Sequence, residues 1–242
     1  MKLIAHRGFS SRAPENTMAA FGMAVEFGAD GLEFDVHLSK DGEVVICHDE
    51  RVDRTTDGQG WIKDFSWPEL QRLDAGSWFG TEFSGARIPR LSELLEMVTD
   101  TRLLINIELK TNIFTYPGIE EKVIRLVQNF GIVNRCIISS FNHYSLVRVG
   151  AILPELKTGA LYDADLFKPW EYATTFGATA LHPEHHSVTP EMVRAAHDRG
   201  LQVNPWTVNE PAHIERMIAA GVDALITNYP ERAKQLLLGA GC

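Results

Sequence analysis

The chain has 242 residues, 45% of them hydrophobic and 23% charged, which is typical of a soluble globular protein. Its net charge of -9 disfavours a general role on nucleic acid or anionic membranes, because those partners need clustered Lys and Arg. The short apolar stretch in MKLIAHRG predicts neither a signal peptide nor a membrane span. Cys47, Cys136 and Cys242 have no metal-like spacing, so we expect a reducing, cytoplasmic location.

Strand-like and helix-like segments alternate along the whole chain. The strand-like runs occupy residues 3–5, 32–38, 103–109, 136–139, 157–161, 178–181, 202–206 and 224–227. Helical patterns with start or stop signals lie at residues 18–28, 93–98, 119–131 and 191–200. Eight rounds of strand and helix in one medium-sized α/β chain predict a closed (β/α)8 TIM barrel, with an open doubly wound sheet as the alternative.

One long segment interrupts this alternation between the second strand and the second barrel helix. A hairpin-like run, KDGEVVICHD, comes first, and a stretch rich in glycine and aromatic residues follows it. Long loops in compact domains are often caps of an active site. Six aromatic side chains in this stretch need burial: Trp61, Phe65, Trp67, Trp78, Phe79 and Phe83. We therefore expect one domain over residues 1–242, with an insertion subdomain at approximately residues 51–88 over the barrel mouth. We also expect substrate preference to reside there.

Carboxylates lie near the ends of two strand-like runs. Because side chains alternate along a strand, Glu33 and Asp35 share one side of LEFDVHL, and Glu108 and Lys110 share one side of INIELK. The ends of parallel barrel strands converge at one face, so the three acids form an oxygen-only site that favours Mg²⁺ or Ca²⁺ over zinc. The alternative is a structural ion-pair network with Arg7 and Lys110.

Two histidines and two cations complete this predicted site. His6 and His48 follow apolar runs, and imidazole exchanges protons near neutral pH, so we predict an acid/base pair. Arg7 and Lys110 are candidate phosphate contacts. The alternatives are core histidines that are hydrogen-bonded and cations that balance the acids.

Three further residues carry weaker signals. The string LHPEHH could mimic a metal site, but we favour a solvated loop with one substrate contact, His182. Phe141 and Trp206 follow strand-like runs and are candidate walls of the substrate pocket, or buried aromatics without a ligand.

Together these strings resemble the glycerophosphodiester phosphodiesterase family, in its bacterial cytosolic form. The resemblance covers nearly the whole chain through IAHRGFSSRAPENT, LEFDVHLSKDGEVVICHDERVDRTTDGQG, RIPRLSEL, INIELK, SSFNH, PWTVN and GVDALITNYP. It implies a (β/α)8 barrel with a small insertion that hydrolyses glycerophosphodiesters to sn-glycerol 3-phosphate and an alcohol. It also implies one divalent cation, Mg²⁺ or Ca²⁺.

The resemblance assigns roles motif by motif. His6 and His48 look like the acid/base pair, the three carboxylates like metal ligands, and Arg7, Lys110 and Glu15 like phosphate or site contacts. Attack by water and attack by a glycerol hydroxyl through a cyclic intermediate both remain open. We expect a small-molecule substrate, no nucleic acid and no membrane span, and a homo-oligomer is compatible with the sequence.

Two other functions fit the residues less well. A sugar-phosphate isomerase or aldolase barrel would use Lys110 as a Schiff-base lysine. A non-catalytic phosphoester-binding protein would not need both histidines.

Overall fold

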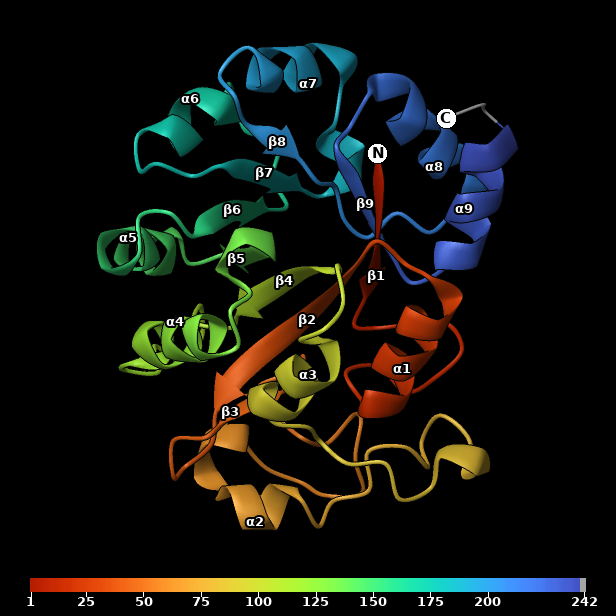
Figure 1. Cartoon of the computed structure of the whole chain (residues 1–242), viewed down its shortest axis with the longest axis vertical. Coiled ribbons are helices and arrows are strands. Elements are labelled where there is room, and N and C mark those ends of the chain that lie inside the picture. The colour runs from red at the N-terminus through yellow and green to blue at the C-terminus, as the bar shows by residue number, and fades with distance from the viewer. Residues whose placement is uncertain (240–242) are drawn as a thin grey trace.

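The computed structural model describes residues 1–239, and residues 240–242, including Cys242, lie outside the described part. Eight parallel strands form the centre of the molecule (Figure 1). They are β1 (Lys2–His6), β2 (Gly31–Leu38), β4 (Leu104–Leu109), β5 (Cys136–Ser140), β6 (Lys157–Tyr162), β7 (Ala180–Pro183), β8 (Gln202–Val203) and β9 (Ala224–Thr227). Each of them matches one predicted run within a few residues.

The strand order follows the chain around a barrel. Within residues 1–239 the order is β8-β7-β6-β5-β4-β2-β1-β9, with parallel pairing throughout. Backbone bonds join the remaining edges, because Asp223 N donates to Val203 O and Ile226 N donates to Pro205 O, both at 3.0 Å. An open doubly wound sheet would reverse its order at a switch point. The predicted (β/α)8 barrel is therefore confirmed.

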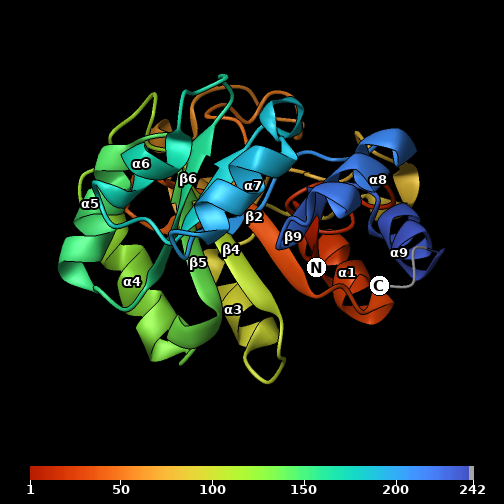
Figure 2. The ribbon, with the colours of Figure 1, turned by 90° about the horizontal axis from the view of Figure 1, so that it is seen from above.

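Helices cover the outside of the strands (Figure 2). They are α1 (Met18–Phe27), α3 (Leu91–Val98), α4 (Ile119–Asn129), α5 (His143–Ile152), α6 (Pro169–Thr174), α7 (Pro190–His197), α8 (Pro211–Ala220) and α9 (Pro230–Gly239). Thr17 caps α1 by accepting from Ala20 N, and Thr189 caps α7 by accepting from Met192 N. The main core fills the layer between the helices and the strands.

Two predicted boundaries differ from the structure. Helix α3 begins at Leu91, two residues before the predicted pattern at 93–98. Its cap position is therefore Arg90 and not Ser92, the residue before that pattern, and Glu93 accepts from Arg90 N. Strand β8 ends at Val203, short of the predicted residue 206, because Pro205 has no N–H for the ladder. The chain stays extended, and Trp206 N donates to Pro183 O at 3.1 Å.

A hairpin strand leads into the long segment. Strand β3 (Val44–Ile46) pairs antiparallel with β2, as KDGEVVICHD predicted. Residues 51–88 then carry only short helices, η1 (Ile62–Asp64), α2 (Trp67–Leu70) and η2 (Thr81–Phe83), and in Figure 1 they lie at the bottom of the view beyond β3 and α3. They share a second small core with β3, built on Val45, Cys47, Val52, Ile62, Trp67, Leu70, Ala75 and Ile88.

The expected burial of all six aromatic residues in this segment is only partly met. Trp67 lies in the small core and Phe65 packs against it, whereas Trp61, Trp78 and Phe79 are exposed. Neighbouring groups cover the exposed rings in part: Arg51 stacks over Trp61 at 4.8 Å, and Phe79 packs edge-on against Trp78 at 5.6 Å.

Among residues 1–239, we find no helix with the length and the apolar character needed to cross a membrane.

Candidate active site

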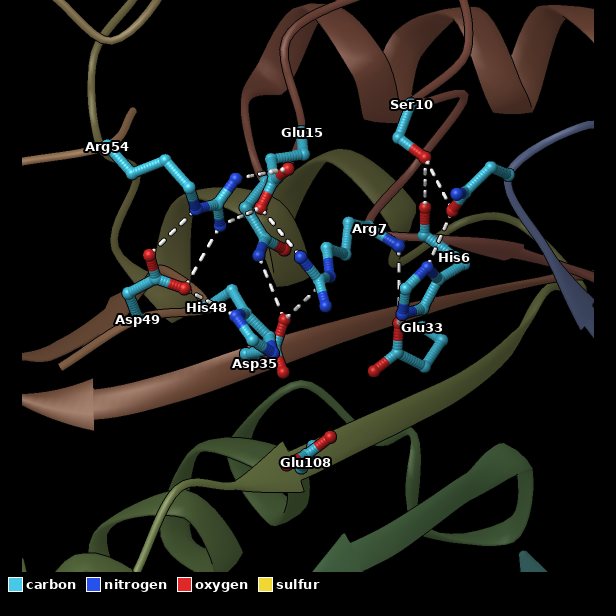
Figure 3. Close-up of polar contacts among 12 residues, drawn as sticks. His6, Arg7, Ser10, Glu15, Glu33, Asp35, His48, Asp49, Arg54 and Glu108 are labelled. Carbon is cyan, nitrogen blue, oxygen red and sulfur yellow. Dashed lines mark hydrogen bonds and ion pairs between the residues drawn. The ribbon is translucent and has the colours of Figure 1, made fainter. Parts of the chain in front are cut away.

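Three buried carboxylates meet at the mouth of the barrel. Glu33 and Asp35 stand on one face of β2, and Glu108 lies opposite Asp35 in the register of β2 and β4 (Figure 3). One oxygen from each carboxylate lies within 4.8 Å of the others. The period-two prediction therefore placed these side chains correctly.

The environment of these acids suits a bound cation. Burial and the neighbouring Asp35 raise the pKa of Glu108 to about 7, and the same two causes raise the pKa of Glu33. Burial opposes ionisation of Asp35 as well, but the charges of Arg7 and Lys110 hold its pKa below the usual value. Oδ1 of Asp35 is buried without a hydrogen-bond partner. A divalent cation would satisfy this oxygen and neutralise the repulsion, so the residues fit a hard metal ion.

His6 ends β1 beside the carboxylates. Its Nδ1 lies 2.6 Å from Oδ1 of Asn228, which also accepts from the Ser10 hydroxyl at 3.0 Å. This amide oxygen fixes Nδ1 as the protonated nitrogen and leaves the Nε2 lone pair facing Glu33 Oε2 at 3.7 Å. Burial, followed by the charge of Arg7, lowers the pKa of His6 to about 3. The ring is therefore neutral in this state.

His48 approaches from the segment after β3. Its Nδ1 lies 2.6 Å from Oδ1 of Asp49, and its Nε2 lies 3.3 Å from Nζ of Lys110. The buried ring of His37 lies 3.2 Å from the carbonyl oxygen of His48 and fixes the backbone there. An aspartate at Nδ1 orients an imidazole and stabilises its protonated form.

Arg7 reaches the site from a tight turn. Its backbone has φ 55, its N donates to Glu33 O at 2.8 Å, and its Nη1 donates to Glu15 at 2.8 Å. Glu15 in turn accepts two bonds from Arg54, which also holds Asp49 (Figure 3). Arg7 Nε is buried and lies 3.6 Å from Oδ2 of Asp35, while the residue also lines the pocket between these groups, where an anion would meet its guanidinium.

A pocket opens between these groups. Its lining consists of His6, Arg7, Glu33, His48, Asn106, Glu108, Ser139, Phe141, Leu161, Trp206, Thr207 and Ile226. Phe141 and Trp206, the two candidate wall residues, both belong to this lining and pack edge-on at 5.4 Å.

Several predicted contacts lie outside this lining. Lys110 is buried behind it, 3.0 Å from Glu108 and 3.8 Å from Asp35, and Glu15 touches the site through Arg7. His182 is fully buried beneath the pocket, with Nε2 3.1 Å from Asn204, and its carbonyl accepts from Trp206 Nε1. The structure therefore gives His182 no direct access to a ligand in this pocket.

Three supporting residues were not assigned roles from the sequence. Asn228 holds His6 across 222 positions of the chain, and Arg54 joins Glu15 to Asp49. Asp49 adjoins His48, and the dipeptide His-Asp was the one local signal for its role.

The comparisons with known proteins agree with this geometry. The model of the "Glycerophosphoryl diester phosphodiesterase family" matches residues 6–232. The chain is 49% identical over 239 residues to a glycerophosphodiester phosphodiesterase of Caldanaerobacter subterraneus subsp. tengcongensis, covering 99% of this chain and 98% of the relative.

Solved structures are similar over the full barrel. A protein of Silicibacter pomeroyi superposes with a TM-score of 0.93 at 28% identity, covering 100% of this chain and 94% of that one. An Oleispira antarctica phosphodiesterase, in complex with the product sn-glycerol-3-phosphate, superposes with a TM-score of 0.88 at 32% identity, covering 98% and 96%. The resemblance seen in the sequence is confirmed: this chain belongs to the glycerophosphoryl diester phosphodiesterase family and is a phosphoric diester hydrolase.

Proposed function

We propose that this protein hydrolyses glycerophosphodiesters to sn-glycerol 3-phosphate and an alcohol, with one Mg²⁺ or Ca²⁺ and a histidine pair. The observation that carries the proposal is the pocket that His6, His48, Glu33 and Glu108 line together. The product named for the Oleispira antarctica structure supports the choice of substrate class.

Glu33, Asp35 and Glu108 would hold the cation through their converging oxygens. Such a cation would supply positive charge to the phosphate oxygens, where negative charge grows in the transition state. Arg7 lines the pocket and supplies further donors to the same oxygens. Lys110 lies outside the pocket lining, where its Nζ pairs with Glu108 and lies 3.3 Å from Nε2 of His48.

The two imidazoles move the protons. One accepts a proton from the attacking oxygen, and the other supplies a proton to the leaving oxygen. Asn228 and Asp49 hold the Nδ1 atoms, so the Nε2 atoms are left to react, and Nε2 of His48 would exchange its contact with Lys110 Nζ for one with the substrate. Phe141 and Trp206 form the apolar wall that keeps water from part of the pocket.

The geometry disfavours the aldolase alternative. Although burial opposes it, Glu108 and Asp35 raise the pKa of Lys110 to about 12. A Schiff-base lysine must lose its proton to attack a carbonyl, so this ammonium group is held in the unreactive form.

We also propose that residues 51–88 form an insertion subdomain on a one-domain barrel. Their shared small core with β3 supports this division. None of the pocket-lining residues comes from the segment, so its influence on substrate choice would act through Arg54 and the rim. A cytoplasmic location remains a prediction, compatible with the buried free thiols of Cys47 and Cys136.

The decisive test is release of sn-glycerol 3-phosphate from glycerophosphocholine, glycerophosphoethanolamine and glycerophosphoglycerol, with Mg²⁺ or Ca²⁺ present. We expect release from at least one substrate, and a fall of about 10²- to 10⁴-fold in His6→Ala and in His48→Ala. His197→Ala is the matched control, because this partly exposed histidine ends α7 and pairs with Asp223, and neither residue lines the pocket. Binding of the diesters without release would support the non-catalytic alternative instead.

A further inference from the structure

A second cluster of metal-binding side chains lies outside the pocket. His185 and His186 belong to η4 (His185–Ser187), directly after β7, and His213 lies in the first turn of α8. The ring centroid of His185 lies 4.0 Å from that of His186 and 4.6 Å from that of His213. The centroids of His186 and His213 are 5.1 Å apart. One nitrogen from each ring lies within 4.8 Å of the other two. We propose that these three histidines bind Zn²⁺.

The donor set separates this cluster from the carboxylate site. Three imidazoles suit zinc and its transition-metal neighbours, whereas three carboxylates suit Mg²⁺ or Ca²⁺. Nitrogen atoms around a tetrahedral zinc lie about 3.3 Å apart, given Zn–N bonds of about 2.0 Å. His186 is exposed, so its side chain can shift together with the Glu184 carboxylate to close the remaining gap.

A carboxylate already orients one of the rings. Nδ1 of His186 lies 2.9 Å and 3.0 Å from the two oxygens of Glu184, and the same carboxylate accepts from His186 N at 2.7 Å. Zinc-binding histidines commonly donate their second ring nitrogen to a carboxylate in this way. Glu184 therefore acts as a positioning residue, and Nε2 of His186 keeps its lone pair for the metal.

The charges around His185 are balanced. Arg216 donates to the carbonyl of His185 at 2.7 Å and lies 3.4 Å from its Nδ1, a position that opposes a cation on that side. Glu184 Oε1 lies 3.4 Å from Nε2 on the other side. With a donor at Nδ1 and a carboxylate at Nε2, the proton of a neutral His185 lies on Nε2 in this state. Zinc at Nε2, the nitrogen that faces favourable charge, therefore requires that proton to move to Nδ1 and Arg216 to give up its contact there.

The cluster is connected to the wall of the active-site pocket. His185 N donates to Trp206 O at 2.9 Å, and Trp206 lines the pocket. A zinc ion here would join the loop after β7 to the start of α8, two segments that lie before and after this tryptophan in the sequence. The role we assign to the metal is structural, because none of the three histidines lines the pocket.

The test uses the full chain, stripped of metal by a chelator and then saturated with Mg²⁺ to fill the carboxylate site. Calorimetric titration with Zn²⁺ should show one equivalent, that is one zinc ion bound per chain, and Mg²⁺ should not displace it. Co²⁺ in its place should give the visible absorption of a tetrahedral nitrogen site. Zinc should also raise the melting temperature.

Four variants make the test specific to the cluster. His186→Ala and His213→Ala should abolish the Mg²⁺-resistant equivalent, and Glu184→Gln should weaken it by about 10- to 100-fold. His197→Ala, a partly exposed histidine on α7 paired with Asp223, should leave it unchanged. His186 is exposed, so its replacement leaves the fold intact. Zinc that Mg²⁺ displaces, or an equivalent that persists in both histidine variants, would overturn the proposal.

Discussion

The two proposed proton carriers differ in the group that holds their Nδ1 atoms. His6 donates to a neutral amide, Asn228, and His48 to a carboxylate, Asp49. The sequence predicted both imidazoles because each follows an apolar run and would lie near the predicted carboxylates. It could not predict Asn228 as a partner, because only closure of the barrel brings residue 228 to residue 6.

Replacing Asp49 by Asn isolates the charge at His48. Asparagine keeps an oxygen at nearly the same place but no longer stabilises an imidazolium, so kcat should fall by about 10²-fold while KM changes little. Steady-state kinetics with the preferred diester measure the effects on kcat and on KM separately. Asp53→Asn is the control, because Asp53 also pairs with an arginine but lies away from His48. Equal kcat values in the two variants would show that the carboxylate at His48 has no catalytic effect.

At the scale of elements, the turn between β1 and α1 sets much of the site geometry. The strand at residues 3–5 and the helix at residues 18–28 followed from hydrophobic pattern and caps. The left-handed backbone of Arg7 and Gly8 did not, because it depends on how closely the turn packs on α1. A Cβ on Gly8 would lie 2.7 Å from the carbonyl carbon of Ala20.

Two glycines, Gly8 in this turn and Gly22 inside α1, give a matched comparison. Gly8→Ala combines a φ of 80 with a backbone clash, so we expect a loss of more than about 1 kcal/mol in unfolding free energy. Gly22→Ala lies inside α1 with nothing within 4 Å of its Cβ, so it should gain about 0.5 to 1 kcal/mol. Urea unfolding measures both. If Gly8→Ala matched Gly22→Ala in stability, the turn would not be constrained as described.

For the whole molecule, the alternation of strands and helices was enough to predict the barrel, because a chain of eight such units closes one parallel sheet. Period-two alternation then predicted the inward carboxylates. What the sequence could not supply were contacts between distant loops: His213 beside His185 and His186, and Arg54 beside Glu15. Such contacts follow from how the loops fold across the barrel mouth, and no local pattern encodes them.

A cation in the carboxylate site would make the stability of the whole barrel depend on metal binding. Glu33, Asp35 and Glu108 are buried together, and only the folded chain gathers them. A cation that binds the folded state alone stabilises it by about 2.7 kcal/mol at 100 times its Kd. For a chain of this size we therefore expect Mg²⁺ to raise Tm by about 5 to 10 °C.

Glu108→Gln separates metal binding from a general salt effect. The amide relieves repulsion from Asp35 but also loses the ion pair with Lys110 at 3.0 Å, so the variant should melt near the wild-type Tm without Mg²⁺, and should lose most of the Mg²⁺-dependent rise. Calorimetric melting of both proteins in Mg²⁺ and in Na⁺ at equal ionic strength measures the difference. The variant should lose diesterase activity together with the Mg²⁺-dependent rise in Tm, because the same three carboxylates would hold the metal for stability and for catalysis. A Tm rise as large in Glu108→Gln as in the wild type would place the Mg²⁺ elsewhere.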